Sequence, residues 1–224
     1  MNKVIVLSLK DSHRRNIIKE RLFRVGIYDF EFHDAFDARN NNIDELNNLF
    51  NIQLFKERYG REPAKGEIGC TISHLMMWEK ISKSNHDNWI ILEDDAIISP
   101  LFKLLFMERN KINGLVILGQ SKLSWLRTLY RVFKLKFKVS YFKTGFEVGI
   151  CSLDNVWGTV GYHIDKKSCD TLLSKVGTAS FLADDWKYFS QFIDIWHVKP
   201  LMIREDYINI KSDISEERES KENA

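Results

Sequence analysis

The chain has 224 residues, a formal net charge of +2 and 44% hydrophobic residues. This composition fits a soluble globular protein of one domain with a sizeable core. No apolar run approaches the roughly eighteen residues of a membrane-spanning helix, and the N-terminal segment is charged too early for a signal peptide, so we expect a cytoplasmic protein.

The first strand and helix are predicted around a basic turn. Residues 4–9 (VIVLSL) form a β-branched run typical of a buried parallel strand, and Ser12 can cap the helix that follows and ends at Gly26. Arg14 and Arg15 lie at the start of this helix, where backbone amides and guanidinium groups favour an anion. The alternative, that both arginines are solvated residues of the first helical turn, is open at this point.

The next segments alternate between strand and helix patterns. Residues 28–36 predict a second strand, residues 40–48 a surface loop or short helix, and residues 57–65 a polar connection. Residues 66–81 (GEIGCTISHLMMWEKI) carry apolar side chains on two faces and predict a helix that is covered on most sides. Cys70 and His74 have a spacing that suits a shared metal ion, but no further ligand of that type is near, so we expect His74 to be a hydrogen-bonded core residue.

The stretch from residue 88 to residue 100 (NWIILEDDAIISP) is the most informative part of the chain. An apolar run leads directly into three carboxylates, those of Glu93, Asp94 and Asp95. Carboxylates near apolar surroundings are costly unless they are neutralised, and a divalent cation is a common remedy. We therefore expect a metal and diphosphate site at the carboxyl end of a strand, and the alternative is an acidic corner wetted by solvent.

Residues 109–146 contain nine basic and no acidic residues, interleaved with aromatic and aliphatic side chains. Such a block attracts phosphate. We interpret it as a flap over the active site or a patch on an anionic membrane surface, and an ordinary amphipathic helix and hairpin is the alternative. A helix over residues 101–107 and a buried strand over residues 114–118 are predicted near it.

The last third of the chain continues the alternation. Residues 155–164 predict a glycine-containing strand, Asp165 caps a helix that ends at Gly177, and Asp184 and Asp185 begin another helix. Residues 193–203 predict the last strand, and residues 212–224 a polar, disordered tail. Strands alternating with helices predict an α/β sandwich with a mostly parallel central sheet flanked by helices. The cysteines, Cys70, Cys151 and Cys169, indicate neither a disulfide framework nor a zinc site.

Three separated segments together resemble glycosyltransferase family 25, the bacterial lipopolysaccharide and lipooligosaccharide glycosyltransferases. These are VLSLKDSHRR, the helix GEIGCTISHLMMWEKI with the strand WIILEDDAII after it, and WGTVGYHIDKKSCDTLL with ADDW downstream. The likeness is nearly whole-chain, and its most specific part is the GCxxSH helix leading into the EDD strand.

The resemblance implies a single-domain GT-A-type fold over residues 1–211. It implies a UDP-sugar donor carrying galactose or glucose, Mn²⁺ or Mg²⁺ as cofactor, and inversion at the anomeric carbon. The implied acceptor is a lipooligosaccharide or lipopolysaccharide at the inner face of the inner membrane. A peripheral contact with that anionic membrane is an open alternative, and no nucleic acid partner is expected.

The resemblance also assigns residues to the donor side. The acidic triplet takes the place of the family's DxD-like motif, with Asp95 nearest the metal and diphosphate, Glu93 as the second metal ligand and Asp94 facing the ribose. The turn after the first strand occupies the place expected to hold uridine and phosphate, through Ser8, Leu9, Arg14 and Arg15.

A base on the acceptor side is the second requirement. A cation bridging the phosphates stabilises the charge of the departing nucleoside diphosphate, and inversion needs a base near the acceptor hydroxyl. Asp185 occupies the family's aspartate position and is the candidate base. Asp184 beside it is the second candidate, and His163 and His197 are further alternatives.

Two other classes of function compete with this hypothesis. A metal-dependent nucleotidyltransferase or phosphohydrolase would use the same carboxylates and release pyrophosphate or phosphate in place of UDP. A non-catalytic protein would grip an anionic membrane or nucleic acid through residues 109–146, with binding that is sensitive to salt.

Overall fold

The computed structural model describes residues 2–107, 114–121, 136–143, 145–154 and 156–208. Within these residues, an eight-stranded sheet has the order β2-β1-β3-β9-β5-β10-β8-β7, and a small sheet has the order β4-β11-β6. The larger sheet contains β1 (Lys3–Ser8), β2 (Phe30–Asp34), β3 (Asn88–Glu93), β5 (Leu115–Ile117), β7 (Val139–Lys143), β8 (Phe146–Ile150), β9 (Gly161–Asp165) and β10 (Ile195–Lys199). The smaller sheet contains β4 (Ala96–Ile98), β6 (Gly119–Gln120) and β11 (Ile203–Glu205).

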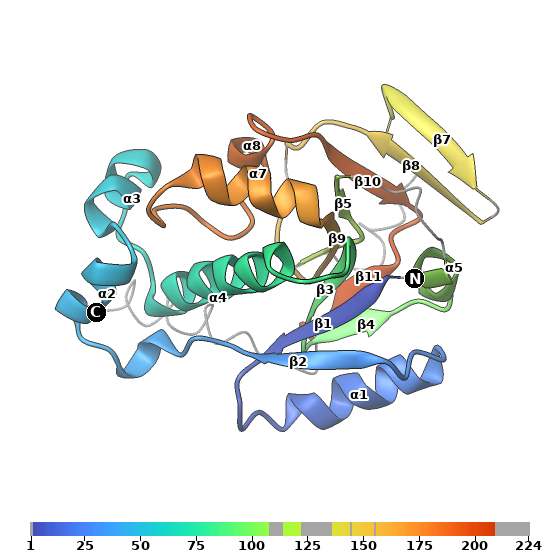
Figure 1. Ribbon diagram of the computed structural model, residues 1–224, viewed down its shortest axis with the longest axis horizontal. Coiled ribbons are helices and arrows are strands. Elements are labelled where there is room, and N and C mark those ends of the chain that lie inside the picture. Colours follow the sequence, from blue (N-terminus) through green and yellow to red (C-terminus); the bar gives the residue numbers. More distant parts are fainter. Residues whose placement is uncertain (1, 108–113, 122–135, 144, 155, 209–224) are drawn as a thin grey trace.

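Helices cover both faces of the larger sheet (Figure 1). On one face lie α1 (Arg14–Arg24) and α5 (Phe102–Met107), and on the other α4 (Lys65–Ser82), α7 (Lys166–Val176) and the short α8 (Trp186–Phe189). The 3-10 helix η1 (Ala38–Asn40) and the helices α2 (Ile43–Leu49) and α3 (Ile52–Tyr59) pack at the N-terminal end of α4. Among the described residues, no helix is both long and apolar enough to cross a membrane.

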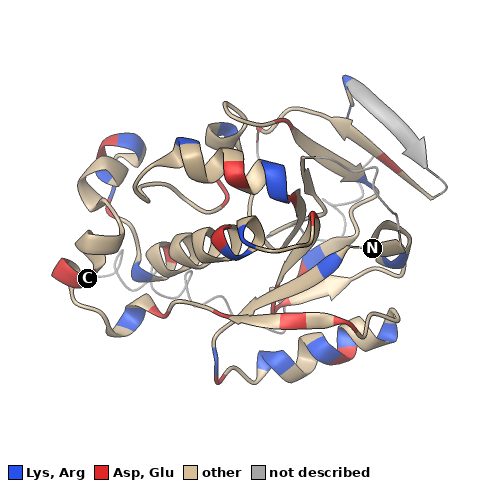
Figure 2. Ribbon diagram, in the orientation of Figure 1, with Lys and Arg blue, Asp and Glu red and all other residues tan. Residues whose placement is uncertain are grey.

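Two hydrophobic cores follow from the alternation of side chains along β1. Val4 and Val6 point into the core under α1, whereas Ile5 and Leu7 point into the core under α4 and α7. Both sets are buried, which explains the uninterrupted apolar run. Figure 2 shows α1 as a helix rich in basic residues, and its buried residues Ile18 and Leu22 belong to the first of these cores.

The predicted α/β class, with helices flanking a central sheet, is confirmed, but the sheet is mixed. Of the seven pairings, β1 with β2, β1 with β3 and β5 with β10 are parallel. β9 lies between β3 and β5 and is antiparallel to both, and β8 is antiparallel to β10 and β7. The expectation of a mostly parallel sheet is therefore wrong for these four pairings, because the apolar pattern of a buried strand does not record its direction.

Most predicted elements occur where expected, with some corrections. The strand predicted over residues 155–164 begins only at Gly161, and the strand predicted over residues 193–203 is two strands, β10 and β11, in different sheets. Helix α3 was not predicted, because polar residues dominate its exposed side. Most of the basic segment at residues 109–146 and the tail at residues 212–224 lie outside the described residues.

The helix cap predicted at Asp165 is confirmed, and the same side chain has a second task. Its Oδ1 accepts a hydrogen bond from the backbone N–H of Ser168 at 2.7 Å and caps α7. Its Oδ2 accepts one from the backbone N–H of Gly114 at 2.6 Å, at the start of β5. One carboxylate thus joins β9, α7 and β5.

We predict that Asp165→Ala lowers the free energy of unfolding by about 2–3 kcal/mol, because it removes a cap and a link between strands. The matched control is Asn42→Ala, which removes the cap of α2 alone and should cost about 1 kcal/mol. Urea unfolding followed by circular dichroism measures both. Equal losses would contradict a structural role for the link to Gly114.

Candidate active site

The acidic triplet lies at the carboxyl end of β3, beside the carboxyl end of the parallel strand β1. The register pairs Leu7 with Glu93, so the residues that follow each strand are neighbours. Ser8 Oγ donates a hydrogen bond to Asp94 Oδ2 at 2.6 Å, and Ser12 Oγ donates to the same oxygen at 3.2 Å. The structure therefore brings the predicted turn and the predicted acidic residues together, as expected for strand ends in an α/β sheet.

The side chain of Asp94 contacts the basic turn after β1. Its side chain accepts the two serine hydroxyls, and Arg14 Nη1 lies 3.8 Å from its Oδ1. The residue is only 8% exposed. Two donors and a nearby cation thus offset the cost of burying this charge.

Arg15 holds the end of β1 in place. Its Nε donates to the Leu9 carbonyl and its Nη2 to the Ser8 carbonyl, both at 3.0 Å. The guanidinium also pairs with Asp34, which lowers the pKa of that carboxyl, and lies 4.9 Å from the ring centre of Phe32. Arg15 therefore shapes the loop that carries Ser8 and Leu9, and its contact with a donor stays a prediction.

Glu93 is the last residue of β3 and lies close to Thr159 and His74. Its Oε1 accepts a short hydrogen bond from the Thr159 hydroxyl and lies 3.7 Å from His74 Nε2. Burial and nearby carboxylates raise the pKa of Glu93 to about 7. This side chain is therefore crowded by like charge.

Asp95 is the least satisfied of the three carboxylates. Its Oδ1 is buried and has no hydrogen-bond partner among the described residues. Burial raises its pKa well above the ordinary value, and the neighbouring carboxylates, Glu93 first, act in the same direction. Its backbone carbonyl, in contrast, is held by Arg21 at 3.2 Å and by the backbone N–H of Asp206 at 3.1 Å.

A fourth carboxylate, Glu205, comes from the C-terminal strand β11. It is paired in register with Ala96, next to Asp95, and its charge raises the pKa of both Glu93 and Asp95. The adjacent Asp206 is 2% exposed and forms a salt bridge with Arg21. Sequence reasoning missed this pair, although the segment MIRED places two adjacent acidic residues shortly after an apolar stretch, separated from it by Arg204.

The donor set of this site fits a hard divalent cation. It consists of carboxylate oxygens, which Mn²⁺ and Mg²⁺ prefer, and it includes the unpartnered buried Oδ1 of Asp95. The negative charges of Glu93, Asp95 and Glu205 repel one another, and this repulsion contributes to the raised pKa values of Glu93 and Asp95. The side chains present thus match the predicted cofactor in chemistry.

A second group of potential ligands adjoins Glu93. Cys70, His74 and Glu93 offer one atom each, all within 4.8 Å of one another. Burial lowers the pKa of His74 to about 3, so the ring is neutral at neutral pH. Burial, together with nearby carboxylates, raises the pKa of the Cys70 thiol well above its usual value. His74 is buried in the core, as expected from the sequence.

The two predicted candidate bases point to different surroundings. Asp184 Oδ2 accepts a hydrogen bond from the backbone N–H of Gly158 at 2.7 Å, and its charge contributes to the raised pKa of Glu93. Gly158 has a φ of 84°, and a Cβ there would lie 1.8 Å from Ser121 Oγ, so the loop needs glycine at this position. Asp184 is therefore the aspartate on the side of the acidic cluster.

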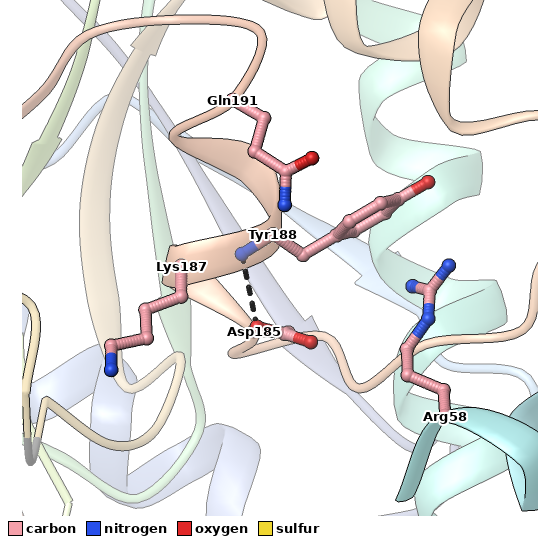
Figure 3. Close-up of a pocket in the computed structure, with 5 residues that line it drawn as sticks. All are labelled: Arg58, Asp185, Lys187, Tyr188 and Gln191. Atoms are coloured by element: carbon pink, nitrogen blue, oxygen red, sulfur yellow. Dashed lines mark hydrogen bonds between the residues drawn. The ribbon is translucent and has the colours of Figure 1, made fainter.

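Asp185 caps α8 and lines a separate open pocket (Figure 3). Its Oδ1 accepts from the backbone N–H of Tyr188 at 3.0 Å, and its Oδ2 accepts the Tyr59 hydroxyl at 2.5 Å. The guanidinium of Arg58 lies 4.0 Å from the ring centre of Tyr188. The other pocket residues are Lys187 and Gln191.

The histidines considered as alternative bases lie within the sheet. His163 is paired in register with Ile90 in β3, and His197 with Ile117 in β5. Both are buried, and burial lowers the pKa of His163 to about 4. The structure does not bring either of them to the strand ends where the acidic triplet lies.

Comparison with known proteins gives a family match over most of the chain. The family model described as "Glycosyltransferase family 25 (LPS biosynthesis protein)" matches residues 1–186. A glycosyltransferase 25 family member of Aedes aegypti is 36% identical over 93 residues, which is 40% of this chain and 15% of that protein. Procollagen galactosyltransferase 2 of Mus musculus is 22% identical over 180 residues, which is 77% of this chain and 27% of that protein.

The chain thus spans less than a third of the length of these relatives. Among solved structures, the inositol-1-phosphate CTP transferase of T. maritima has a TM-score of 0.49 at 15% identity, covering 96% of this chain and 94% of that one. The galactosyltransferase LgtC has a TM-score of 0.40 at 11% identity, covering 87% and 72%.

The raised pKa of Glu93 predicts a pH-dependent cost in stability. In the folded protein the pKa of Glu93 is about 7, above the ordinary value of roughly 4.3. The stability that protonated Glu93 contributes is therefore fully present below pH 4.3 and is lost as the pH rises through 7. In EDTA, Glu93→Gln should therefore gain stability over the wild type across this window, by about 1–3 kcal/mol in total.

Urea unfolding of both proteins at several pH values measures this difference. Comparing the two at each pH cancels the contribution of the buried histidines, which they share. If the difference in unfolding free energy between the two proteins stays constant from pH 4 to pH 8, the pKa of Glu93 is not raised in the folded protein.

Proposed function

Because the chain belongs to glycosyltransferase family 25, we propose that it transfers a hexose from a UDP-sugar to a saccharide hydroxyl with inversion at the anomeric carbon. Galactose is the first candidate for this hexose, and glucose is the second. The observation that carries the proposal is the group of carboxylates at the ends of β3 and β11, beside the basic turn after β1. The galactosyltransferases among the relatives favour galactose. The family's description favours a lipopolysaccharide or lipooligosaccharide acceptor.

On the donor side, Asp95 and Glu93 are the proposed cation ligands, and Glu205 is a third candidate. The cation, Mn²⁺ or Mg²⁺, would neutralise the charge that the departing UDP accumulates. This role is supported by the oxygen donor set and by the unpartnered Oδ1 of Asp95. Asp95 lies in a turn whose backbone carbonyl is held by Arg21 and by the backbone N–H of Asp206, so the turn that carries this carboxylate is fixed within the fold.

The turn after β1 is the proposed nucleotide-binding wall, with Ser8, Leu9, Arg14, Arg15 and Asp94. Arg15 fixes the Ser8 and Leu9 carbonyls, and the hydroxyls of Ser8 and Ser12 fix Asp94. Arg14 is the cation of the turn that faces Asp94, and it is the proposed phosphate contact. In this arrangement Arg15, Ser8 and Ser12 hold the turn in its conformation, and the guanidinium of Arg14 supplies the positive charge for the phosphate.

On the acceptor side, Asp184 is our first candidate base and Asp185 the second, which reverses the order expected from sequence. Asp184 is supported by its electrostatic contact with Glu93 and by its bond to the Gly158 loop. Asp185 is committed to the cap of α8 and to Tyr59. A base must reach the acceptor hydroxyl, and a carboxylate beside the donor site is better placed to do so.

The acceptor itself is proposed to be anionic. The support is the basic composition of residues 109–146, which suits a phosphorylated oligosaccharide or an anionic membrane surface that carries it. On this proposal, the enzyme works on a lipid-linked acceptor at a membrane surface.

We predict transfer of label from a UDP-hexose to truncated lipooligosaccharide in the presence of Mn²⁺, with release of UDP. The measurement is a panel of labelled UDP-sugars, with Asp95→Asn as the inactive control that should lose Mn²⁺-dependent UDP binding as well as turnover. Release of pyrophosphate in place of UDP would assign a nucleotidyltransferase. Neither transfer nor UDP-sugar hydrolysis with any donor would refute the proposal.

We predict that Asp184→Asn lowers kcat by at least about a hundredfold and leaves the affinity for UDP and Mn²⁺ close to that of the wild type. The matched variant Asp185→Asn should lose about 1 kcal/mol of stability, because the cap of α8 is weakened, and retain most of its turnover. Steady-state kinetics and calorimetric UDP binding measure both. The opposite ranking of the two kcat values would return the base to Asp185.

A further inference from the structure

A chain of buried polar side chains connects the core to Glu93. Trp78 Nε1 donates a hydrogen bond to the Tyr162 hydroxyl oxygen at 2.9 Å, and His74 Nδ1 lies 2.8 Å from the same oxygen. Trp78 and His74 are one helical turn apart on α4, and Tyr162 is on the central strand β9. All three side chains are buried, so each polar atom needs a partner within the protein.

The donors and acceptors of Trp78, Tyr162 and His74 determine the tautomer of His74. An indole N–H can only donate, so the Tyr162 oxygen accepts from Trp78 and has one hydrogen of its own to donate. Among the described residues, His74 Nδ1 is the acceptor within reach, and a buried hydroxyl without an acceptor would cost about 1–3 kcal/mol. Nδ1 therefore accepts, and the hydrogen of the neutral ring lies on Nε2.

This Nε2–H faces Glu93. Nε2 is buried, has no hydrogen-bond partner in the described part of the chain, and lies 3.7 Å from Glu93 Oε1. The same Oε1 already accepts the Thr159 hydroxyl, whereas Oε2 accepts no hydrogen bond from the described residues. Among the described residues, the Thr159 hydroxyl and His74 Nε2 thus both lie on the Oε1 side of this carboxylate.

We infer that His74 is a positioning residue, which presents an Nε2–H to the Oε1 side of Glu93 and so leaves Oε2 for the cation of the sugar-nucleotide donor. The cation part of this inference rests on the proposed function. The tautomer part rests only on Trp78, Tyr162 and His74. Partners that orient a ligating carboxylate typically change metal affinity by about 10–100-fold when they are removed.

A competing role for His74 is as a metal ligand together with Cys70 and Glu93, since the three ligand atoms lie within 4.8 Å. A metal on Nε2 would require the hydrogen on Nδ1. The Tyr162 oxygen would then accept from both His74 and Trp78, and its own hydroxyl hydrogen would lack an acceptor among the described residues. The need of the Tyr162 hydroxyl for an acceptor therefore favours His74 Nε2 as a hydrogen-bond donor over His74 as a metal ligand.

The tautomer can be measured without substrate or cation. In the full-length ¹⁵N-labelled protein at pH 7, long-range ¹H–¹⁵N correlation should show His74 with a protonated Nε2 and an unprotonated Nδ1. His74→Gln identifies the signals by their disappearance. A protonated Nδ1 would overturn the inference, as would a cobalt–thiolate absorption band that appears on adding Co²⁺ and is lost in Cys70→Ser.

Two amide variants that differ by one methylene test the positioning role. In His74→Gln the longer side chain places an amide N–H₂ near the Nε2 position, whereas in His74→Asn the shorter side chain can reach only Tyr162. We expect the dissociation constant of Mn²⁺, measured through Mn²⁺-dependent UDP binding, to rise about tenfold or more in His74→Asn and to stay within about threefold in His74→Gln. A purely structural role would lower the thermal stability of both and leave Mn²⁺ affinity unchanged, which would overturn the inference.

The two measurements separate this inference from the proposed function. A wild-type protein that binds no UDP with Mn²⁺ would refute the donor site and, with it, the cation part of the role of His74. The tautomer measurement needs neither ligand, so its result decides the assignment of the hydrogen in either case.

Discussion

The structure depends on the parallel pairing of β1 and β3, because it brings the acidic triplet to an edge of the sheet where neighbouring carboxylates raise one another's pKa. Asp94 accepts hydrogen bonds from the hydroxyls of Ser8 and Ser12 and lies near Arg14. Glu205 from β11 crowds both Glu93 and Asp95, and Asp184 from the loop before α8 crowds Glu93 as well. Such crowding is destabilising in the absence of a counter-charge, which is typical of sites built for a ligand.

The features that the sequence predicted well are those that local residues determine. The ends of β1 and β3 follow from apolar runs that stop at polar residues, and the cap at Asp165 follows from an aspartate before a helical pattern. The meeting of the triplet with the basic turn also follows, because parallel neighbouring strands end at the same edge of a sheet. The direction of β9 was not predictable in this way, since burial on both faces gives the same apolar pattern in either direction.

The features that the sequence did not predict depend on contacts between distant residues. Thr159 and Glu205 reach the site only because β9 and β11 return to the ends of earlier strands. Asp184 and Asp185 are indistinguishable in sequence, yet the second caps α8 and the first bonds to the Gly158 loop, so their carboxylates face different surroundings. A helix cap fixes the direction of one side chain, and the adjacent residue is then directed by the chain that packs against it.

The buried polar chain through Tyr162 has a cost that a hydrophobic core would avoid. Apolar side chains at positions 74, 78 and 162 together could fill the space between α4 and β9 without any requirement for paired donors and acceptors. The hydrogen-bonded alternative is stable only in one arrangement of its hydrogens, and that arrangement directs a single N–H toward Glu93. An apolar core would fix the position of β9 equally well but would leave the Glu93 carboxylate without this constraint. The polar chain is therefore better explained by the orientation of Glu93 than by the stability of the sheet.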